Sequence, residues 1–287
     1  MIQGLREGFW PFEEGEWDHD DGEVSQNFSK TELDANVIRA FCNKEVLAER
    51  WSEPLSHSIL LPGMKTSPMF VIWQNNKPRV VTDHSASGLN DGIPREEAKV
   101  RYNDMRSFGQ MLYNACRHFP DRHLVVWKSD VASAFLNLPA HPWWQMRQVV
   151  QVDGNLYIVR HLVFGNRASP RIWCSVSGLL CWLAVYKLGL HGTQVYMDDY
   201  FGWDFLDNLT LYHGIPRPRQ QVQFLVLWDF LSCPFEDRKQ EHGESLKIIG
   251  FWVDPNLGSI LLLSESVDNV IAHINTFLDH GSRCPPL

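Results

Sequence analysis

Alternating and continuous apolar runs, separated by polar turn residues, predict a chain rich in β-hairpins. The turn segments 74–77, Asp153-Gly154 and 254–256 lie between such runs, and Asp-Gly favours a tight hairpin turn. The hairpins predicted in this way pair residues 69–73 with 79–82, 148–152 with 156–160, and 247–253 with 259–263. Shorter apolar runs predict buried strands at 124–127, 194–197 and 200–203.

Longer segments with helical spacing predict helices between and after these strands. Ser29-Lys30-Thr31-Glu32 is a capping-box pattern that predicts a helix to about Trp51. Its predicted core-facing residues are Leu33, Val37, Phe41 and Val46. Ser169-Pro170 starts a helix that ends before Gly189, and further helices are predicted at 219–231 and 267–278. The pattern therefore predicts an α+β fold, with an antiparallel sheet and helices packed on one face.

Acidic charge is concentrated at the N-terminus. The net charge is −8, and residues 1–23 hold eight acids against one base, Arg6, which accounts for −7 of it. Residues 1–27 are therefore predicted to be a disordered or loosely attached acidic arm. The remainder is nearly neutral, which argues against strong autonomous binding of nucleic acid.

The cysteines and the apolar stretches exclude several protein classes. No CxxC pair occurs, so neither a zinc site nor a disulfide framework is predicted. The N-terminus lacks the apolar segment of a signal peptide, and the most apolar stretch, residues 173–186, is too short and too polar to span a bilayer. We expect an intracellular protein without a membrane partner, in the nucleus or the cytoplasm.

Adjacent carboxylates at Asp198 and Asp199 are the first candidate for chemistry. Apolar residues precede and follow them, which places the pair at the tip of a buried hairpin. Two neighbouring carboxylates repel each other unless a cation or solvent relieves the repulsion, and Mg²⁺ prefers such oxygen ligands. The alternative is a solvent-exposed turn, which aspartate also favours.

Asp130 is the second candidate, at the end of a predicted buried strand. An unpartnered carboxylate is costly in such a position. If its strand neighbours the hairpin, Asp130, Asp198 and Asp199 converge, and three carboxylates can hold two metal ions for phosphoryl or nucleotidyl transfer. The alternative is that Asp130 caps the short helical turn that follows.

Several segments resemble reverse transcriptase motifs and occur in the order of that family. They are 127–139 (WKSDVASAFLNLP, first palm motif), 162–170 (LVFGNRASP, second), 196–199 (YMDD, third), 230–243 (fourth), 248–251 (primer-grip hairpin), and 77–83 with Leu89-Asn90 (fingers). The chain thus resembles the reverse transcriptase domain of a retrotransposon, of the LTR or tyrosine-recombinase type, over about residues 55–280. The resemblance implies the fingers and palm of a right-hand polymerase.

The resemblance also implies residue roles. Asp130, Asp198 and Asp199 would ligate two Mg²⁺ ions, or Mn²⁺, with Asp199 the less critical, and the Val131 carbonyl would join them. Lys239 would protonate the leaving pyrophosphate, or would be a solvated lysine in an acidic run. The nucleotide would meet Arg79 at its phosphates, Phe135 at the position that excludes a ribose 2′-hydroxyl, and Gly165 through a close backbone approach. The implied partners are deoxynucleoside triphosphates and an RNA or DNA template with its primer.

The implied segments are the acidic arm (1–27), an N-terminal helix and fingers (28–125), a palm (126–263) and the start of a thumb or connection (264–287). Ile72 stands where many family members carry a lysine. The family's thumb, connection and RNase H domains would follow position 287. An enzyme without a thumb is expected to hold primer and template weakly.

Two other functions compete with an RNA-directed DNA polymerase. A catalytically weak or inactive retroelement remnant, acting as an interaction protein, would keep the fold and lose the activity. An RNA-dependent RNA polymerase or a two-metal nuclease would use similar carboxylates. Phe135 and Met197 argue against the RNA polymerase, and the absence of other His or Asp clusters argues against the nuclease.

Overall fold

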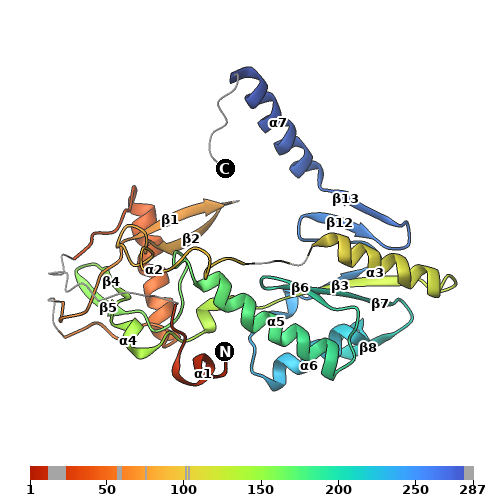
Figure 1. Cartoon of the computed structure of the whole chain (residues 1–287), viewed down its shortest axis with the longest axis horizontal. Helices are drawn as coiled ribbons and strands as arrows, with labels where there is room; N and C mark the ends of the chain where they lie inside the picture. The colour runs from red at the N-terminus through yellow and green to blue at the C-terminus, as the bar shows by residue number, and fades with distance from the viewer. Residues whose placement is uncertain (12–23, 57–59, 75, 101, 103, 281–287) are drawn as a thin grey trace. The chain divides into compact units, whose positions relative to one another are not determined.

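The computed structural model describes residues 1–287 except 12–23, 57–59, 75, 101, 103 and 281–287. The chain divides into two compact units (Figure 1). Unit 1 comprises Met1–Arg101 and Ser133–Gly178, and unit 2 comprises Tyr102–Ala132 and Leu179–Leu287. The predicted segments 28–125 and 126–263 differ from this division, because residues 102–125 belong to unit 2 and residues 133–178 to unit 1.

Unit 1 combines two hairpins with helix α2. Its elements are α1 (Ile2–Glu7), α2 (Glu32–Leu47), β1 (Met69–Gln74), β2 (Lys77–Thr82), η1 (Ala134–Asn137), α4 (Pro142–Gln145), β4 (Val149–Val152) and β5 (Asn155–Ile158). Apolar side chains from α2 and both hairpins form its main core, which includes Ile38, Met69 and Val150. The predicted hairpins at 69–82 and 148–160 are confirmed, with antiparallel pairing from Met69↔Thr82 and from Val149↔Ile158.

Unit 2 is built on a four-stranded antiparallel sheet in the order β10-β3-β7-β6. Its elements are α3 (Met105–His118), β3 (Leu124–Asp130), β6 (Gln194–Tyr196), β7 (Asp199–Phe205), β8 (Leu209–Tyr212), β9 (Ile215–Pro218), α6 (Arg219–Phe230), η2 (Asp237–Lys239), β10 (Glu241–Gly243), β11 (Leu246–Ile248), β12 (Phe251–Asp254), β13 (Ser259–Leu262) and α7 (Ser264–His280). Helix α5 (Ser169–Lys187) begins in unit 1 and ends in unit 2.

Helices pack on both faces of this sheet. Phe108 of α3 contacts Phe201 with ring centroids 4.9 Å apart, and Phe224 of α6 contacts the neighbouring Tyr200 at the same separation. Successive strand residues point to opposite faces, so α3 and α6 lie on opposite sides. The α+β class and the antiparallel sheet are confirmed. The expectation that helices pack on one face is corrected, because α3, which was not predicted, covers the second face.

A close approach of two strands explains one glycine of the sheet. Trp127 in β3 is fully buried and pairs with Gly202 in β7. A Cβ at position 202 would lie 2.4 Å from the Trp127 indole, so only glycine leaves room for the ring. The Trp127 ring packs, tilted by 35°, against the Phe224 ring of α6, with the ring centroids 5.7 Å apart.

The N-terminal segment differs from its prediction. Within the predicted arm, residues 1–11 and 24–27 are described, and there the prediction of disorder is wrong. Residues 2–7 form α1, the Phe9 side chain is buried, and the backbone N–H of Ser25 donates to Thr66 Oγ1 at 2.7 Å. Most of the acidic residues that motivated the prediction lie outside the described residues.

Helix α2 begins later than predicted. Its N-cap is Thr31, whose hydroxyl accepts from the Asp34 backbone N–H, so the capping role assigned to Ser29 was wrong. Leu33 lies in the first turn and is exposed, while Ile38 and Cys42, one and two turns further on, are buried. The other predicted core residues of this helix, Val37, Phe41 and Val46, are partly buried against the unit 1 core.

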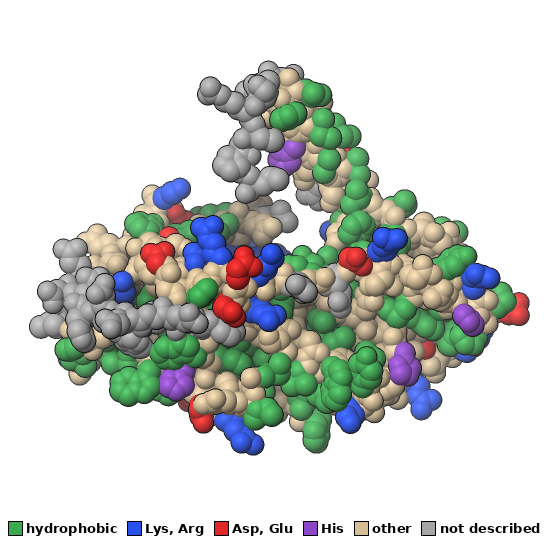
Figure 2. Space-filling view, in the orientation of Figure 1, with side chains coloured by type: hydrophobic (Ala, Val, Ile, Leu, Met, Phe, Trp, Pro, Cys, Tyr) green, Lys and Arg blue, Asp and Glu red, His purple; other side chains and the backbone are tan. Residues whose placement is uncertain are grey.

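Exposed hydrophobic side chains lie along α7 and along β13, the strand before it (Figure 2). Leu261, Val270, Ile274 and Phe277 each expose about half of their surface. None of the helices in the described part of the chain combines the length and the hydropathy that a membrane span requires.

Candidate functional site

A tight turn between β6 and β7 presents two carboxylates. Tyr196 pairs with Asp199, so Met197 and Asp198 form a two-residue turn. Met197 adopts φ 59°, in the left-handed region that favours glycine. Such backbone strain concentrates at functional sites, where the surrounding structure compensates for it. Here the compensation comes from the β6–β7 pairing, which fixes Asp198 in the turn and Asp199 at the start of β7.

Asp130 lies directly opposite this turn. It is the last residue of β3 and pairs with Asp199, the first residue of β7. Beyond it, the Val131 backbone N–H donates to the Asp198 carbonyl at 3.4 Å, and Val131 bridges to Phe235. The three predicted carboxylates therefore lie at neighbouring strand ends of unit 2. Asp130 does not cap the following turn, since the N-cap of η1 is Ser133.

Mutual repulsion and burial act on Asp199. Burial is the largest cause that raises its pKa to about 6, and the charges of Asp198 and Asp130 raise it further. Lys128 and Lys239 oppose the shift. Asp199 is only partly accessible to solvent, so water screens this repulsion incompletely.

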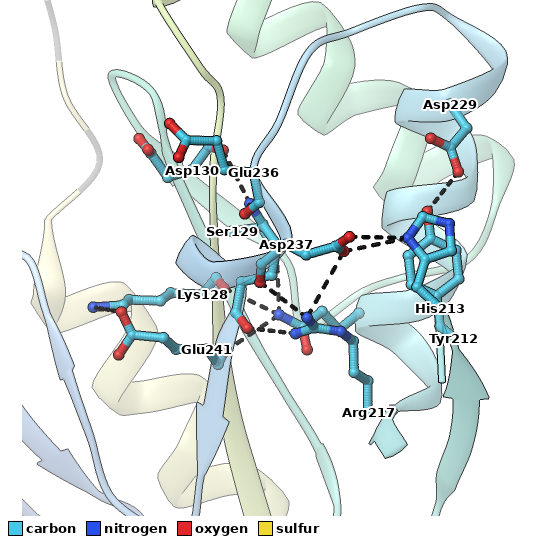
Figure 3. Close-up of polar contacts among 12 residues, drawn as sticks. Lys128, Ser129, Asp130, Tyr212, His213, Arg217, Asp229, Glu236, Asp237 and Glu241 are labelled. Atoms are coloured by element: carbon cyan, nitrogen blue, oxygen red, sulfur yellow. Dashed lines mark hydrogen bonds and ion pairs between the residues drawn. The ribbon is translucent and has the colours of Figure 1, made fainter. Parts of the chain in front are cut away.

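Two lysines, Lys239 and Lys128, oppose the charge of the carboxylates, and Figure 3 shows Lys128 beside its partner Glu241. Lys239 Nζ donates to Asp130 Oδ2 at 3.0 Å and lies 3.3 Å from Glu236 Oε1. The hydrogen bond to Asp130 is the largest cause that raises the pKa of the Lys239 ammonium. Lys128 pairs with Glu241 at 3.0 Å. Lys239 is thus held at the carboxylates, and it is a weaker acid while it is paired with Asp130.

Two buried glutamines hold the ends of these strands. Gln240 Nε2 donates to the Asp130 carbonyl at 3.2 Å and to the Glu236 carbonyl at 3.0 Å. Gln221 Nε2, from α6, donates to the Lys128 carbonyl at 3.0 Å. Sequence reasoning did not assign either glutamine a role, because an amide has no motif of its own. The only available signal for Gln240 was its place next to Lys239.

The donor set suits a hard divalent cation. Among the described residues, no group of three or more His, Cys, Asp or Glu side chains is already gathered as a metal-binding cluster. The charges of Asp130 and Asp198 nevertheless both act on Asp199, and Lys239 donates to the Asp130 carboxylate. Carboxylate oxygens under mutual repulsion are ligands that Mg²⁺ accepts, and a cation there would relieve the repulsion.

Three of the residues predicted to meet a nucleotide, Arg79, Phe135 and Gly165, lie in unit 1, and the fourth, Val131, lies in unit 2. Arg79 is exposed on β2, across the hairpin from Ile72. Phe135 is 5% exposed, and its ring lies 4.5 Å from that of Phe164. A Cβ on Gly165, at φ +105°, would lie 1.9 Å from the Thr82 carbonyl oxygen. Close packing against β2 therefore explains why position 165 is glycine, without a contact to a nucleotide.

Replacing Asp199 with Asn is expected to stabilise the metal-free protein. A carboxyl group with a raised folded-state pKa binds its proton more tightly when folded, so its ionisation opposes folding. That cost appears as pH rises from about 4 to about 6 and is fully present above this range. We expect Asp199→Asn to raise the free energy of unfolding at pH 7.5 by about 2 kcal/mol, and to change it little at pH 4.

Urea unfolding in EDTA at both pH values measures this gain. Asp121→Asn, at an exposed turn of the same unit, is the matched control and should change stability by less than about 0.5 kcal/mol. An Asp199→Asn protein that is equally stable or less stable at pH 7.5 would show that the carboxylate repulsion is absent.

Solved structures of foamy viral protease-reverse transcriptase share this fold. A foamy viral protease-reverse transcriptase in complex with double-stranded DNA matches with TM-score 0.60 and 15% identity, over 92% of this chain and 39% of that chain. A second such complex matches with TM-score 0.57 and 15% identity, over 93% and 48%. The complex with an RNA/DNA hybrid matches with TM-score 0.58 and 17% identity, over 86% and 29%.

These likenesses show a reverse-transcriptase-like fold. The chain spans less than half the length of each of these structures. No protein-family model matches the sequence, and no curated protein resembles it in sequence.

Proposed function

We propose that this chain is the fingers and palm of a retroelement RNA-directed DNA polymerase. The observation that carries the proposal is the placement of Asp130, Asp198 and Asp199 at neighbouring strand ends of unit 2. The reverse-transcriptase-like fold supports it, because the carboxylates occur in the motifs that resemble that family. A retrotransposon origin belongs to the same proposal and rests on the style of those motifs.

Nucleic acid is the proposed partner, as a template with an annealed primer. The similar structures hold double-stranded DNA or an RNA/DNA hybrid. The near-neutral charge outside residues 1–23 predicts weak binding by this chain alone. Assays therefore require low salt and high concentrations of primer and template.

The proposed reaction joins the primer 3′-oxygen to the α-phosphorus of a deoxynucleoside triphosphate and releases pyrophosphate. Asp130, Asp198 and Asp199, with the Val131 carbonyl, would hold two Mg²⁺ or Mn²⁺ ions. Such ions lower the pKa of the attacking hydroxyl and stabilise charge on the leaving group. The chain itself positions the reactants, and no covalent intermediate with the protein is needed.

Lys239 is the proposed proton donor to pyrophosphate. Its ammonium pairs with Asp130 at 3.0 Å, and this pairing raises its pKa. Proton donation thus requires that Lys239 first leave Asp130. A second cation bound to the Asp130 carboxylate would release Lys239. Proton donation by Lys239 would then depend on a bound cation. Arg79, on unit 1, is the proposed partner of the triphosphate.

Phe135→Val is expected to relax discrimination against ribonucleotides. The smaller side chain would leave room for a 2′-hydroxyl, and the preference for deoxynucleotides should fall by roughly 10- to 100-fold. Competing single-nucleotide additions on an RNA template measure this ratio. Phe164→Val removes the same ring contact from the other side, so it controls for packing. An equal loss of preference in both variants would assign Phe135 to the core alone.

Single-turnover primer extension tests the proposed function. The purified chain is given an RNA template, a DNA primer and deoxynucleotides, with Mg²⁺, with Mn²⁺ or with EDTA. We expect extension by one or more nucleotides that depends on the divalent cation. A folded chain that extends no primer on RNA or DNA, with either metal and with saturating primer and template, would contradict the function and favour an inactive remnant.

A further inference from the structure

A hairpin that the sequence did not predict contacts the segment 237–240, which contains Lys239. Strands β8 and β9 pair from Leu209↔Pro218 to Tyr212↔Ile215 and lie between β7 and α6 along the chain. The side chains of Tyr212, His213 and Arg217 reach from this hairpin toward neighbouring polar groups (Figure 3). None of these residues belongs to the motifs that carry the proposed chemistry.

Arg217 is the most deeply buried of them. Only 2% of its surface is exposed, and burial lowers the pKa of its guanidinium. Its Nη1 donates to the Gln240 carbonyl, and its Nη2 donates to the Asp237 carbonyl at 3.0 Å. A buried guanidinium is costly unless it is hydrogen-bonded, and here two backbone carbonyls of one short segment accept from its Nη1 and Nη2.

That segment in turn reaches the candidate metal ligand. Gln240 donates to the Asp130 carbonyl at 3.2 Å, and Lys239 donates to the Asp130 carboxylate at 3.0 Å. Arg217 thus contacts the backbone on both sides of Lys239. The planar guanidinium fixes two carbonyls at once, which an ammonium does less well.

Further contacts hold the hairpin in place. The Tyr212 hydroxyl donates to Asp229 on α6, and His213 Nδ1 lies 3.1 Å from Asp237 Oδ2. Asp237 also lies 3.9 Å from Arg217 Nη2. The loop is therefore held through its backbone and through one carboxylate by the same hairpin.

We propose that Arg217 is a positioning residue that orients the 237–240 segment, and through it Lys239 and Asp130. The catalytic consequence rests on the proposed function, but the orientation of the segment does not. If Arg217 were purely structural, its replacement would lower the stability of the whole of unit 2. It would not increase the local opening of residues 237–240 more than that of the other residues. Amide hydrogen exchange within residues 237–240 distinguishes the two roles.

Hydrogen exchange of the metal-free chain tests the orientation. In Arg217→Lys and Arg217→Met we expect the amides of Lys239 and Gln240 to exchange at least about 10-fold faster, while amides in the β3–β7 pairing stay protected. The Lys variant retains the charge and covers the case in which the Met variant does not fold. Arg219→Lys, at an exposed site on the next helix, is the matched control. Unchanged exchange at 239 and 240 in the Lys variant, or uniform acceleration across unit 2, would overturn the proposal.

A double-mutant cycle tests the catalytic consequence. If Arg217 acts through Lys239, then Arg217→Lys should slow single-nucleotide addition about 10-fold in the wild type and less than about 2-fold in a Lys239→Met background. Equal fold-losses in both backgrounds would overturn action through Lys239. A wild-type chain without extension activity would overturn the proposed function alone, because the exchange experiment still decides the orientation of the segment.

Discussion

Asp198→Asn is expected to reduce primer extension by at least about 1,000-fold, equivalent to about 4 kcal/mol of transition-state stabilisation. Asp198 occupies the strained turn between β6 and β7, and its charge acts on Asp199. The amide keeps the shape of the side chain and removes the charge that would hold a divalent cation. Asp130→Asn should have a similar effect, and Asp199→Asn a smaller one.

The measurement is single-nucleotide addition on an RNA template, with folding confirmed by unfolding curves. Asp121→Asn is the control for the loss of one negative charge from unit 2. Since Asp199→Asn is expected to stabilise the protein while it impairs activity, stability and function should separate at this cluster. Wild-type rates in the Asp198→Asn protein would remove Asp198 from the reaction.

Gly165→Ala is expected to destabilise unit 1 by about 3 kcal/mol or more, or to prevent its folding. The new Cβ would lie 1.9 Å from the Thr82 carbonyl oxygen, so the backbone would have to move. That movement breaks the hydrogen bond from the Thr82 N–H to the Phe164 carbonyl, at 3.0 Å, and disturbs the Asn90 side chain, which donates to the Gly165 carbonyl at 2.8 Å.

Gly154→Ala is the control that measures the cost of a left-handed backbone without a steric clash. Gly154 also has positive φ, at +82°, but a Cβ there would meet nothing within 4 Å. We expect this control to cost about 1 kcal/mol, from the left-handed backbone alone. Urea unfolding of both variants gives the comparison. Equal costs would mean that Gly165 is required for its φ and not for its contact with β2.

The hairpins at 69–82 and 148–160 and the carboxylate turn were predictable because their signals are local. In the predicted hairpin of 247–253 with 259–263, the first strand is wrong, since it divides into β11 and β12, which pair with each other. The turn at Asp153-Gly154 fixes the β4–β5 register, and the YMDD sequence lies between two apolar runs. Helix α3 also had a local signal that was missed. Asp104 caps it by accepting from Ser107 N–H, and Phe108, Leu112 and Ala115 follow at helical spacing and are buried.

Other features depend on contacts between distant parts of the chain. Two prolines, Pro216 and Pro218, lie in β9 and weaken its strand signal, because proline lacks the N–H of the ladder. Arg217 and Gln240 are buried although both are polar, since each meets backbone carbonyls far along the sequence. A pattern of hydrophobic and polar positions assigns such residues to the surface.

The two units follow from long-range packing in the same way. Residues 102–132 and 133–178 are consecutive, yet they join different cores. The junction carries Ser133 at φ 64° and Ala134 at φ 34°, a left-handed pair without glycine. Nothing in the residue types at 133–134 predicts such a turn. The predicted segments, each continuous in sequence, therefore could not match the two units.

Binding of Mn²⁺ alone tests the central claim, that Asp130, Asp198 and Asp199 form a divalent-cation site. Electron paramagnetic resonance counts free Mn²⁺ while the wild-type chain and the Asp198→Asn chain are titrated at pH 7.5, with Mg²⁺ as competitor. We predict saturable binding to the wild type that Mg²⁺ displaces, and binding at least about 10-fold weaker in the variant, a difference of about 1.4 kcal/mol. Equal binding by the two proteins, or no saturable binding by the wild type, would contradict the claim.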